Sequence, residues 1–332
     1  MKIFPGVHQF KVPLPDSTLE YINSYLVRGD RNSLLIDTGW DAPGAFDDLR
    51  QQFAADGVTM EEISQVLITH AHPDHYGLAG RFKQLTDAKV MVHEVEVEQI
   101  VSQYIGLDIF LTSMESWLAE NGVEKGDLPK LPKASLPAKK FVVPTSIDAA
   151  VHDGDVISVG YFNLKVFWTP GHSPGHVCLH EPAKKLLFTG DHILPDISPH
   201  VGSNPHSSDS PLSDFLTSLL KLRDLDVDLI LPAHGRVFTN LTARVEELLH
   251  HHEEREQDIL RILDDNPKTA YDVATRITWM KDHGGRPYSQ LPSLDKRLAI
   301  MEAVSHLRLL LDKGKVRRLH DNGLITYTGS GN

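Results

Sequence analysis

Four short apolar segments of this sequence each run into a side chain that can bind a metal ion. The four side chains are His70, His172, Asp191 and His234, and the segments before them read Val-Leu-Ile-Thr, Val-Phe-Trp-Thr-Pro-Gly, Leu-Leu-Phe-Thr-Gly and Leu-Ile-Leu-Pro-Ala. Short apolar runs of this kind predict buried strands. Loops at strand ends commonly carry functional groups, because the buried strand fixes the backbone while the loop stays accessible. We therefore expect the four strand ends to converge on one site.

The first of these segments is followed by three more potential ligands. The run Thr69-His70-Ala71-His72-Pro73-Asp74-His75 adds His72, Asp74 and His75, so the set contains five imidazoles and two carboxylates. The one cysteine, Cys178, excludes a thiolate cage and an internal disulfide, and its apolar surroundings are typical of an inert buried thiol. Nitrogen and oxygen ligands of this kind suit zinc, iron or manganese.

Seven ligands exceed what one tetrahedral ion binds, and they match two ions that share a carboxylate and a water molecule. Metal coordination lowers the pKa of water from 15.7 to about 7, so hydroxide becomes available near neutral pH. We expect two Zn²⁺ ions, with iron or manganese as alternatives, and a bridging hydroxide as the nucleophile. Asp74 is expected to orient this nucleophile or accept its proton as well as to bind metal.

The pattern of apolar runs and turns predicts two β-rich halves that alternate with helices. A turn is expected at 28–31, and 122–144 is expected to form an irregular surface connection. This order predicts an α/β fold in which sheets are covered on the outside by helices. The expected strands are 21–27, 33–36, 65–68, 89–92, 156–159, 164–168, 177–179, 185–188 and 228–231, and the expected helices are 43–55, 78–85, 95–120, 212–225 and 241–263.

A break at Asn266-Pro267 introduces a different pattern in the tail. Helices are expected at 269–277 and 298–311, followed by a turn at 313–315 and a β-hairpin that ends near 327, an order that resembles a winged helix. We expect a catalytic domain over residues 1–262 and a small C-terminal domain over 263–332. The tail also carries a locally basic set, interpreted as a solvated face or a dimer contact rather than a phosphate site. Its members are Lys296, Arg297, Arg308, Lys313, Lys315, Arg317 and Arg318.

The overall composition is that of an ordinary globular protein, with 41% hydrophobic and 23% charged residues. The 45 acidic residues outnumber the 33 basic ones, and the formal net charge of −12 opposes general attraction to nucleic acid and favours a small-molecule substrate. Residues 1–15 lack the apolar stretch of a signal peptide, and no run approaches the roughly 20 apolar residues that a membrane span needs. We expect a cytoplasmic protein without membrane contact.

The metal-binding motif and the later segments together resemble one known family. His70-x-His72-x-Asp74-His75 is similar to the signature of the metallo-β-lactamase superfamily in its hydrolase branch, close to glyoxalase II and related thioesterases, lactonases and ribonucleases. The resemblance covers residues 1 to 262 and implies an αββα sandwich, while the tail resembles the winged helix attached to β-lactamase-like hydrolases. The later motifs follow in the family's order: Thr169-Pro170-Gly171-His172-Ser173-Pro174-Gly175-His176, Phe188-Thr189-Gly190-Asp191 and Pro232-Ala233-His234-Gly235.

The resemblance implies a role for each ligand. His70, His72 and His172 would hold one metal, Asp74, His75 and His234 would hold the other, and Asp191 would bridge the two. Asp37, in the run Leu-Leu-Ile-Asp-Thr-Gly, would orient a ligand through a hydrogen bond. A histidine stands at position 72, where related flavin-linked diiron oxygen reductases tend to carry glutamate, and this favours hydrolysis over redox chemistry.

Residues beside the motifs are candidates for supporting the site. His176 follows the second motif, and Tyr76 follows the first, either as a donor to an oxyanion or as a packing residue. For His192 and His200 a structural role is at least as well supported as a functional one.

Two more distant groups of residues have both a structural and a functional interpretation. The run His250-His251-His252 lies in a strongly charged helix and is interpreted as a solvated face rather than a metal tract. Tyr104, Phe110 and Trp117 are expected to pack their helix against the sheet, and the alternative is an apolar acyl-binding wall under a lid.

The favoured function is hydrolysis of a thioester or ester of a small acyl substrate, without a covalent enzyme intermediate. One alternative is a metal-dependent ribonuclease that holds RNA on the tail, and another is a regulator in which the winged helix binds DNA. Lactone opening or hydrolytic dehalogenation would use the same site with a different pocket. The tail is also a candidate for homodimer formation.

Overall fold

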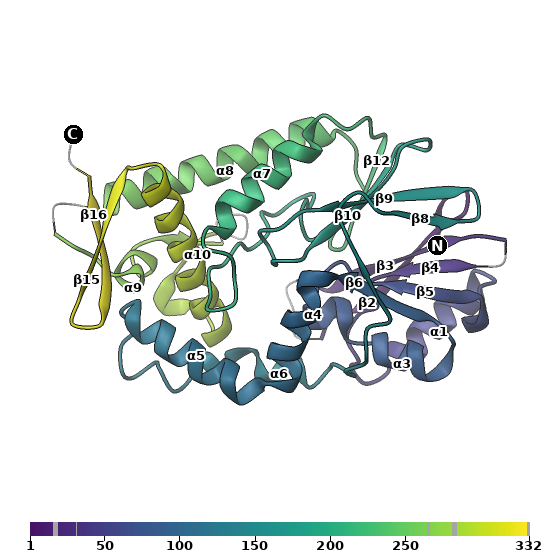
Figure 1. Cartoon of the computed structure of the whole chain (residues 1–332), viewed down its shortest axis with the longest axis horizontal. Coiled ribbons are helices and arrows are strands. Elements are labelled where there is room, and N and C mark those ends of the chain that lie inside the picture. Colours follow the sequence, from purple (N-terminus) through teal and green to yellow (C-terminus); the bar gives the residue numbers. More distant parts are fainter. Residues whose placement is uncertain (16–18, 31, 264–265, 281–283, 331–332) are drawn as a thin grey trace.

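The computed structural model describes residues 1–332 except 16–18, 31, 264–265, 281–283 and 331–332. Its centre is a pair of β-sheets that pack face to face, with helices outside each sheet (Figure 1). The first sheet has the order β1-β2-β3-β4-β5-β6-β7, antiparallel from β1 to β4 and parallel from β4 to β7. Its strands are β1 (Lys2–Phe4), β2 (Val7–Pro13), β3 (Tyr21–Arg28), β4 (Ser33–Ile36), β5 (Ile63–Leu67), β6 (Lys89–His93) and β7 (Ala149–Val151).

The second sheet has the order β12-β11-β10-β9-β8 and is antiparallel except between β11 and β12. A core between the sheets takes apolar side chains from both, including Leu34 and Leu67 from the first sheet and Leu164 and Phe188 from the second. All four are at most 1% exposed, so the two sheets exclude water from each other's inner face. Its strands are β8 (Val156–Val159), β9 (Phe162–Trp168), β10 (Val177–Glu181), β11 (Leu186–Gly190) and β12 (Leu229–Pro232).

Helices complete the layers on the outer faces. On the first sheet, α1 (Ala45–Ala55) and α3 (Ala79–Leu85) bury Leu49, Phe53 and Phe82. On the second sheet, α7 (Pro211–Arg223) and α8 (Leu241–Ile262) cover the outer side chains (Figure 1). The predicted αββα sandwich is therefore confirmed.

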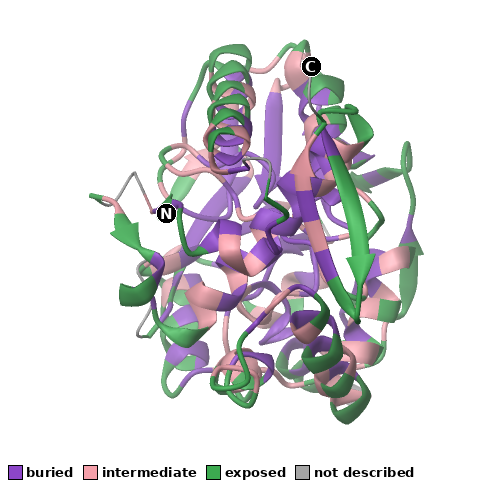
Figure 2. Cartoon of the chain, turned by 90° about the vertical axis from the view of Figure 1, so that its left-hand side faces the viewer, coloured by how far each residue is buried: buried purple, intermediate pink, exposed green. Residues whose placement is uncertain are grey.

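The C-terminal elements appear in the predicted order of helix, helix and hairpin. They comprise α9 (Ala270–Ala274), the short strands β13 (Thr278–Trp279) and β14 (Arg286–Pro287), α10 (Ser293–Asp312), and a hairpin of β15 (Val316–Asp321) and β16 (Leu324–Gly329). Figure 2 looks at this end of the molecule, where β15 is exposed after its first residue.

The core of this C-terminal part is shared with an earlier helix. Helix α5 (Leu107–Glu120) contributes Phe110, Met114 and Trp117 to one apolar cluster with α9, α10 and the hairpin. The expectation of packing against the sheet is thus corrected for Phe110 and Trp117, which the tail buries, whereas Tyr104 does pack against the core of the first sheet. The boundary at 262/263 coincides with the end of α8 and remains a prediction.

The helical stretch predicted at 95–120 has an interruption that the sequence pattern did not predict. Helix α4 (Glu94–Ile100) passes into a π-helical turn (Val101–Ile105), and α5 begins after Gly106. The predicted connection at 122–144 contains short helical turns, namely a 3-10 turn (Pro132–Ser135) and α6 (Leu136–Lys139). The predicted turn at 28–31 joins β3 and β4, whose pairing reaches Arg28 and Ser33, although residue 31 lies outside the described residues.

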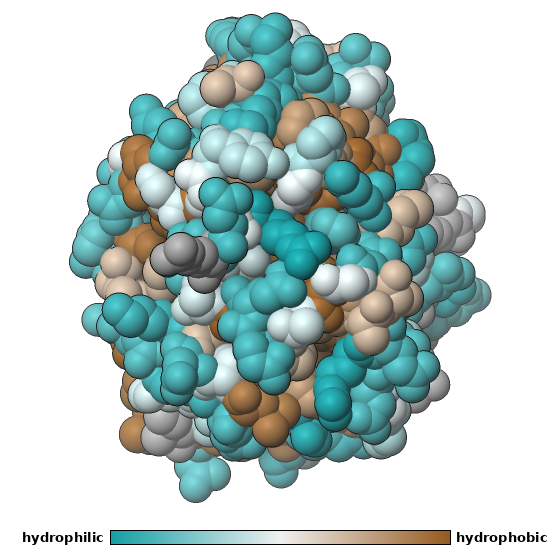
Figure 3. Space-filling model, turned by 90° about the vertical axis from the view of Figure 1, so that its right-hand side faces the viewer, coloured by the Kyte–Doolittle hydropathy of each residue, from teal (hydrophilic) through white to brown (hydrophobic). Residues whose placement is uncertain are grey.

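The face of the molecule opposite the C-terminal elements is mainly polar. Figure 3 shows the end of the molecule opposite the C-terminal elements, where apolar side chains are scattered among polar ones. Within the described part of the chain, no helix has the length and apolarity needed to cross a bilayer.

Candidate metal centre

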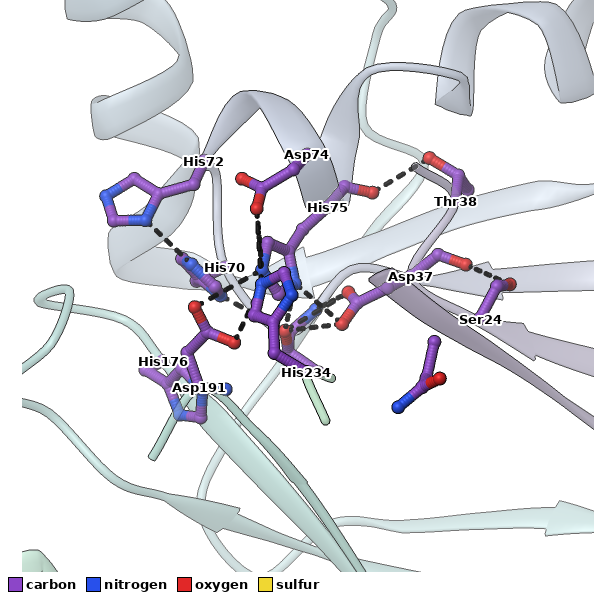
Figure 4. A network of polar contacts seen from close by, with 12 residues as sticks. Ser24, Asp37, Thr38, His70, His72, Asp74, His75, His176, Asp191 and His234 are labelled. Atoms are coloured by element: carbon purple, nitrogen blue, oxygen red, sulfur yellow. Dashed lines mark hydrogen bonds and ion pairs between the residues drawn. The ribbon is translucent and has the colours of Figure 1, made fainter. Parts of the chain in front are cut away.

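The predicted ligands lie on loops that leave the ends of the strands and on the short helix α2 (Pro73–Tyr76), and they meet at one site (Figure 4). His70 follows β5, His172 follows β9, Asp191 follows β11 and His234 follows β12. Gly190, which ends β11, has a φ of 49°, and a Cβ there would lie 2.6 Å from Nε2 of His176. Only glycine therefore lets this strand turn into the site.

The local structure of the first motif separates its side chains. Helix α2 (Pro73–Tyr76) begins at Pro73, whose fixed φ suits the first position of a helix. His72 precedes it in an extended conformation, while Asp74 and His75 lie in its only turn. As a result, His72 points away from Asp74 and His75 (Figure 4).

Three imidazole nitrogens form a first cluster. Nε2 of His70 lies 2.9 Å from Nδ1 of His72, and Nε2 of His172 lies 3.1 Å and 3.0 Å from these two atoms. Ligand atoms 2.0–2.1 Å from a tetrahedral zinc would be about 3.3 Å apart, so the spacing fits one ion.

Two histidines and two aspartates form a second cluster. Nε2 of His234 lies 3.3 Å from Oδ2 of Asp74 and 3.5 Å from Oδ1 of Asp191, and Nε2 of His75 lies 3.5 Å from Oδ2 of Asp191. The same Oδ2 of Asp191 is 3.6 Å from Nε2 of His172, so this carboxylate connects the two clusters. Nε2 of both His75 and His234 and Oδ1 of Asp191 are buried without a hydrogen-bond partner. Buried polar atoms left in this state fit a bound cation.

The opposite ring nitrogens are held by acceptors. Nδ1 of His75 lies 2.8 Å from Oδ2 of Asp37, Nδ1 of His172 lies 2.8 Å from the carbonyl oxygen of His200, and Nδ1 of His234 lies 3.1 Å from that of Tyr21. Donation from Nδ1 leaves the lone pair of Nε2 free to face the cluster. Asp37 thus has the position that its predicted orienting role requires, and its other oxygen accepts from the backbone N–H of Thr69 at 2.8 Å.

The electrostatics differ between the clusters. Burial lowers the pKa of His70, His72 and His172, that of His72 to about 3, so these rings are neutral near pH 7. Burial also acts to lower the pKa of His75 and His234, but nearby carboxylates outweigh it and raise both values. Neutral imidazoles and ionised carboxylates are the forms that bind metal, and a cation would replace the protons on the second cluster.

Comparisons with known proteins identify the family to which the chain belongs. The sequence profile of the metallo-beta-lactamase superfamily matches residues 17–234. A probable metallo-hydrolase of Bacillus subtilis is 31% identical over 271 residues, which is 80% of this chain and 83% of that protein. The chain belongs to the metallo-β-lactamase superfamily. With its His/Asp clusters, it is a metal-dependent hydrolase of this superfamily.

Other superfamily members extend the comparison. An acyl-coenzyme A thioesterase of Gallus gallus is 31% identical over 226 residues, covering 65% of this chain and 73% of that protein. The crystal structure of a metallo-beta-lactamase family protein from Thermus thermophilus superposes with a TM-score of 0.85 at 28% identity, over 99% of this chain and 100% of the other. A beta-lactamase domain protein from Burkholderia ambifaria gives 0.82 at 26% identity, over 99% and 94%. Both structural matches extend through the C-terminal elements.

Two of the loops that carry metal ligands are joined by a residue that the sequence analysis did not single out. The carboxylate of Glu96, on α4, accepts hydrogen bonds from the N–H of Ala71 (2.8 Å), the hydroxyl of Ser173 (2.7 Å) and the N–H of Gly175 (2.8 Å). Glu96 is 1% exposed. It therefore ties the loop of His70 and His72 to the loop of His172.

His176 and Tyr76 have different surroundings. Nε2 of His176 accepts the N–H of Asp191 at 3.1 Å, and its Nδ1 lies 2.8 Å from the hydroxyl of Thr169, so it positions the connecting carboxylate. The hydroxyl of Tyr76 instead bonds both the carbonyl and the N–H of Thr145, at 2.9 Å and 2.8 Å. The packing interpretation of Tyr76 therefore replaces its role as an oxyanion donor.

Of the remaining histidines, some have a structural role in the interior and others lie on the surface. His200 contacts the site through its carbonyl, while its Nε2 lies 3.0 Å from the carbonyl of Leu298. His192 is buried beside the ring of Phe215. The solvated-face interpretation holds for His250, whose side chain is 70% exposed, but is wrong for His252, which is buried against α10.

Several members of the basic tail are not free for a partner. Arg297 is buried and donates to the carbonyls of Leu131 and Pro132. Arg308 donates to the carbonyl of Asp209, and Lys313 pairs with Glu256 at 2.6 Å. The expectation of a solvated basic face is thus wrong for Arg297, whose guanidinium fixes α10 to the 131–135 turn.

Proposed function

We propose that this chain hydrolyses acyl thioesters with two bound metal ions, and that His70, His72 and His172 hold one ion while Asp74, His75 and His234 hold the other. Asp191 would contact both. The observation that carries the proposal is the convergence of buried nitrogen and oxygen atoms into overlapping three-residue groups, each within 4.8 Å. Zinc is the first choice of metal, because imidazole and carboxylate ligands without thiolate suit it.

When bound, the two ions would polarise a carbonyl oxygen and make hydroxide available near neutral pH. The chain's own contribution is to hold the ligands rigidly. Asp37, His200 and Tyr21 fix three imidazole rings from behind. Rings held in this way need little reorganisation during the reaction.

Asp74 is the side chain that we propose to handle a proton. It is 17% exposed, against 10% for Asp191, so it is the more accessible carboxylate. Although burial raises its pKa, the neighbouring His75 and His234 lower it to about 2, and the carboxylate is ionised near pH 7. Asp74 can therefore bind metal, orient the attacking water or accept its proton.

The thioester class rests on the thioesterase relative and on the acidic chain. Arg297 and Arg308 are engaged within the chain, but Arg317 and Arg318 on β15 are exposed, so the argument against a ribonuclease is the net charge of −12. Lactones and haloalkanes fit the same chemistry and belong in the same assay. We further propose that the partner is a small acyl compound, and homodimer formation remains a prediction.

The test is a substrate panel on the metal-loaded protein. Thioesters of coenzyme A and glutathione, a lactone, a haloalkane and an RNA oligonucleotide would be assayed before and after removal of metal by a chelator, and after zinc is restored. We expect thioester hydrolysis that is lost with the metal and regained with it. Full hydrolysis by the stripped protein, or turnover of RNA alone, would contradict the proposal.

A further inference from the structure

Two cavities adjoin one another beside the metal centre. The smaller, of about 180 Å³, is lined by His234 together with Tyr21, Pro195 and Ile197. The larger, of about 270 Å³, lies where the 195–200 loop meets the C-terminal elements. Leu19 and Ile197 line both cavities, so the larger one is next to the cavity that His234 lines.

The larger cavity has a mainly apolar wall. Its apolar side chains come from both parts of the chain: Leu19, Ile197 and Pro199 from the catalytic part, and Trp279, Leu291 and Leu298 from the tail. The indole N–H of Trp279 donates to the carbonyl of Ala274 at 2.8 Å, which leaves the ring as an apolar surface. Apolar lining with a few polar groups is typical of small-molecule sites.

The charged groups that line this cavity include one arginine, Arg255, and two carboxylates, those of Asp295 and Glu302. Nε of Arg255 lies 3.8 Å from Oε1 of Glu302, its Nη1 donates to the carbonyl of Thr278, and its guanidinium lies 4.8 Å from the centre of the Trp279 ring. Burial raises the pKa of the half-buried Asp295. Because two carboxylates accompany the one arginine, the cavity suits an uncharged ligand better than an anion.

We propose that the larger cavity binds the apolar acyl chain of the substrate, so that the C-terminal elements select chain length. This inference rests on the proposed thioesterase function. About nine water molecules occupy a volume of about 270 Å³ in liquid water. A methylene group takes up slightly less volume than a water molecule. The cavity therefore fits an acyl chain of about eight to ten carbons.

The kinetic test compares chain lengths. In the wild type, we expect kcat/KM for coenzyme A thioesters to rise about two- to fourfold per methylene from butanoyl to octanoyl, mainly through KM. Leu298→Trp fills the cavity and should lower the octanoyl-to-acetyl ratio of kcat/KM at least tenfold, while Leu298→Ala should shift the optimum to longer chains. The matched control is Leu220→Trp on α7, at a side chain that is 48% exposed, and it should leave the ratio within twofold.

A binding test separates this inference from the proposed function. Titration with 1-octanol, which has no thioester or carboxylate, should give a saturable change in tryptophan emission that is lost in Trp279→Phe, and ethanol should give none. If no thioester is hydrolysed but 1-octanol binds at Trp279, the proposed function fails and the apolar site stands. If thioesters of all lengths are hydrolysed equally, or Leu298→Trp impairs acetyl and octanoyl substrates alike, or 1-octanol does not bind, the inference is overturned.

Discussion

Replacing Glu96 by glutamine should weaken the first metal cluster while leaving the second nearly intact. One oxygen of Glu96 accepts from Ser173 and Gly175, and the other accepts from Ala71. A glutamine can keep the first pair with its carbonyl oxygen, but its amide then points an N–H at the N–H of Ala71. A buried donor is left unsatisfied between His70 and His72.

The magnitude follows from the bond that is lost. An unsatisfied buried N–H costs about 1 to 3 kcal/mol. Burial raises the pKa of Glu96, so the desolvated charge already offsets part of what its three hydrogen bonds contribute, and the neutral glutamine avoids that cost. We therefore expect a net loss of stability near the lower end of this range, while metal affinity at the first cluster should fall about 10- to 100-fold, as is usual for residues that orient ligands.

The assay is equilibrium dialysis against buffered zinc, with bound metal counted by mass spectrometry. At zinc concentrations that fill both clusters of the wild type, Glu96→Gln should retain about one ion, because Asp74, His75 and His234 do not depend on Glu96. Glu98→Gln is the matched control, since it removes the same charge from an exposed position on the same helix. Two ions bound by Glu96→Gln with wild-type affinity would refute the reasoning.

Two further predictions address the other cluster and the C-terminal contact. Asp37→Asn should lower the affinity of the second ion about 10- to 100-fold in a competition with a coloured chelator, because the amide has one acceptor oxygen and cannot accept from both Nδ1 of His75 and the N–H of Thr69, and an unchanged affinity would contradict this role. Burial, with the charges of His251 and Arg255, lowers the pKa of His252 to about 3, below the unfolded value of about 6.5. The unfolded chain therefore takes up a proton that the fold resists, and stability is lost as the pH falls from 6.5 towards 3. Between pH 7 and pH 5, the free energy of unfolding of His252→Leu in urea should therefore rise by about 2 kcal/mol relative to that of the wild type, and a constant difference would count against this account.

The metal ligands could be predicted from the sequence because their positions follow local rules. A short apolar run that ends in histidine or aspartate predicts a loop at a strand end, and the four such ends do meet. Glu96 has no comparable local sign. Its partners at Ala71 and Gly175 are backbone groups, 25 and 79 residues away, and its own helix reads as an alternation of glutamate and valine.

Burial where the tail packs against α8 and the 131–135 turn could not be predicted from the sequence either. Neighbouring residues of a helix point in directions about 100° apart, so His250 faces solvent while His252 faces α10. Arg297 is buried only because the carbonyls of Leu131 and Pro132, more than 160 residues away, lie against α10. Charge and periodicity describe a helix, but they do not say which distant segment covers it.

The most direct test of the two-metal centre is the number of ions that the wild-type chain binds. Purified protein stripped with a chelator and dialysed against zinc should bind two ions per chain, and X-ray absorption should show only nitrogen and oxygen ligands. Asp191→Asn should weaken both ions, because Asp191 is the carboxylate that contacts both clusters. A wild-type chain that binds a single ion at saturation, with unchanged binding in Asp191→Asn, would contradict the account.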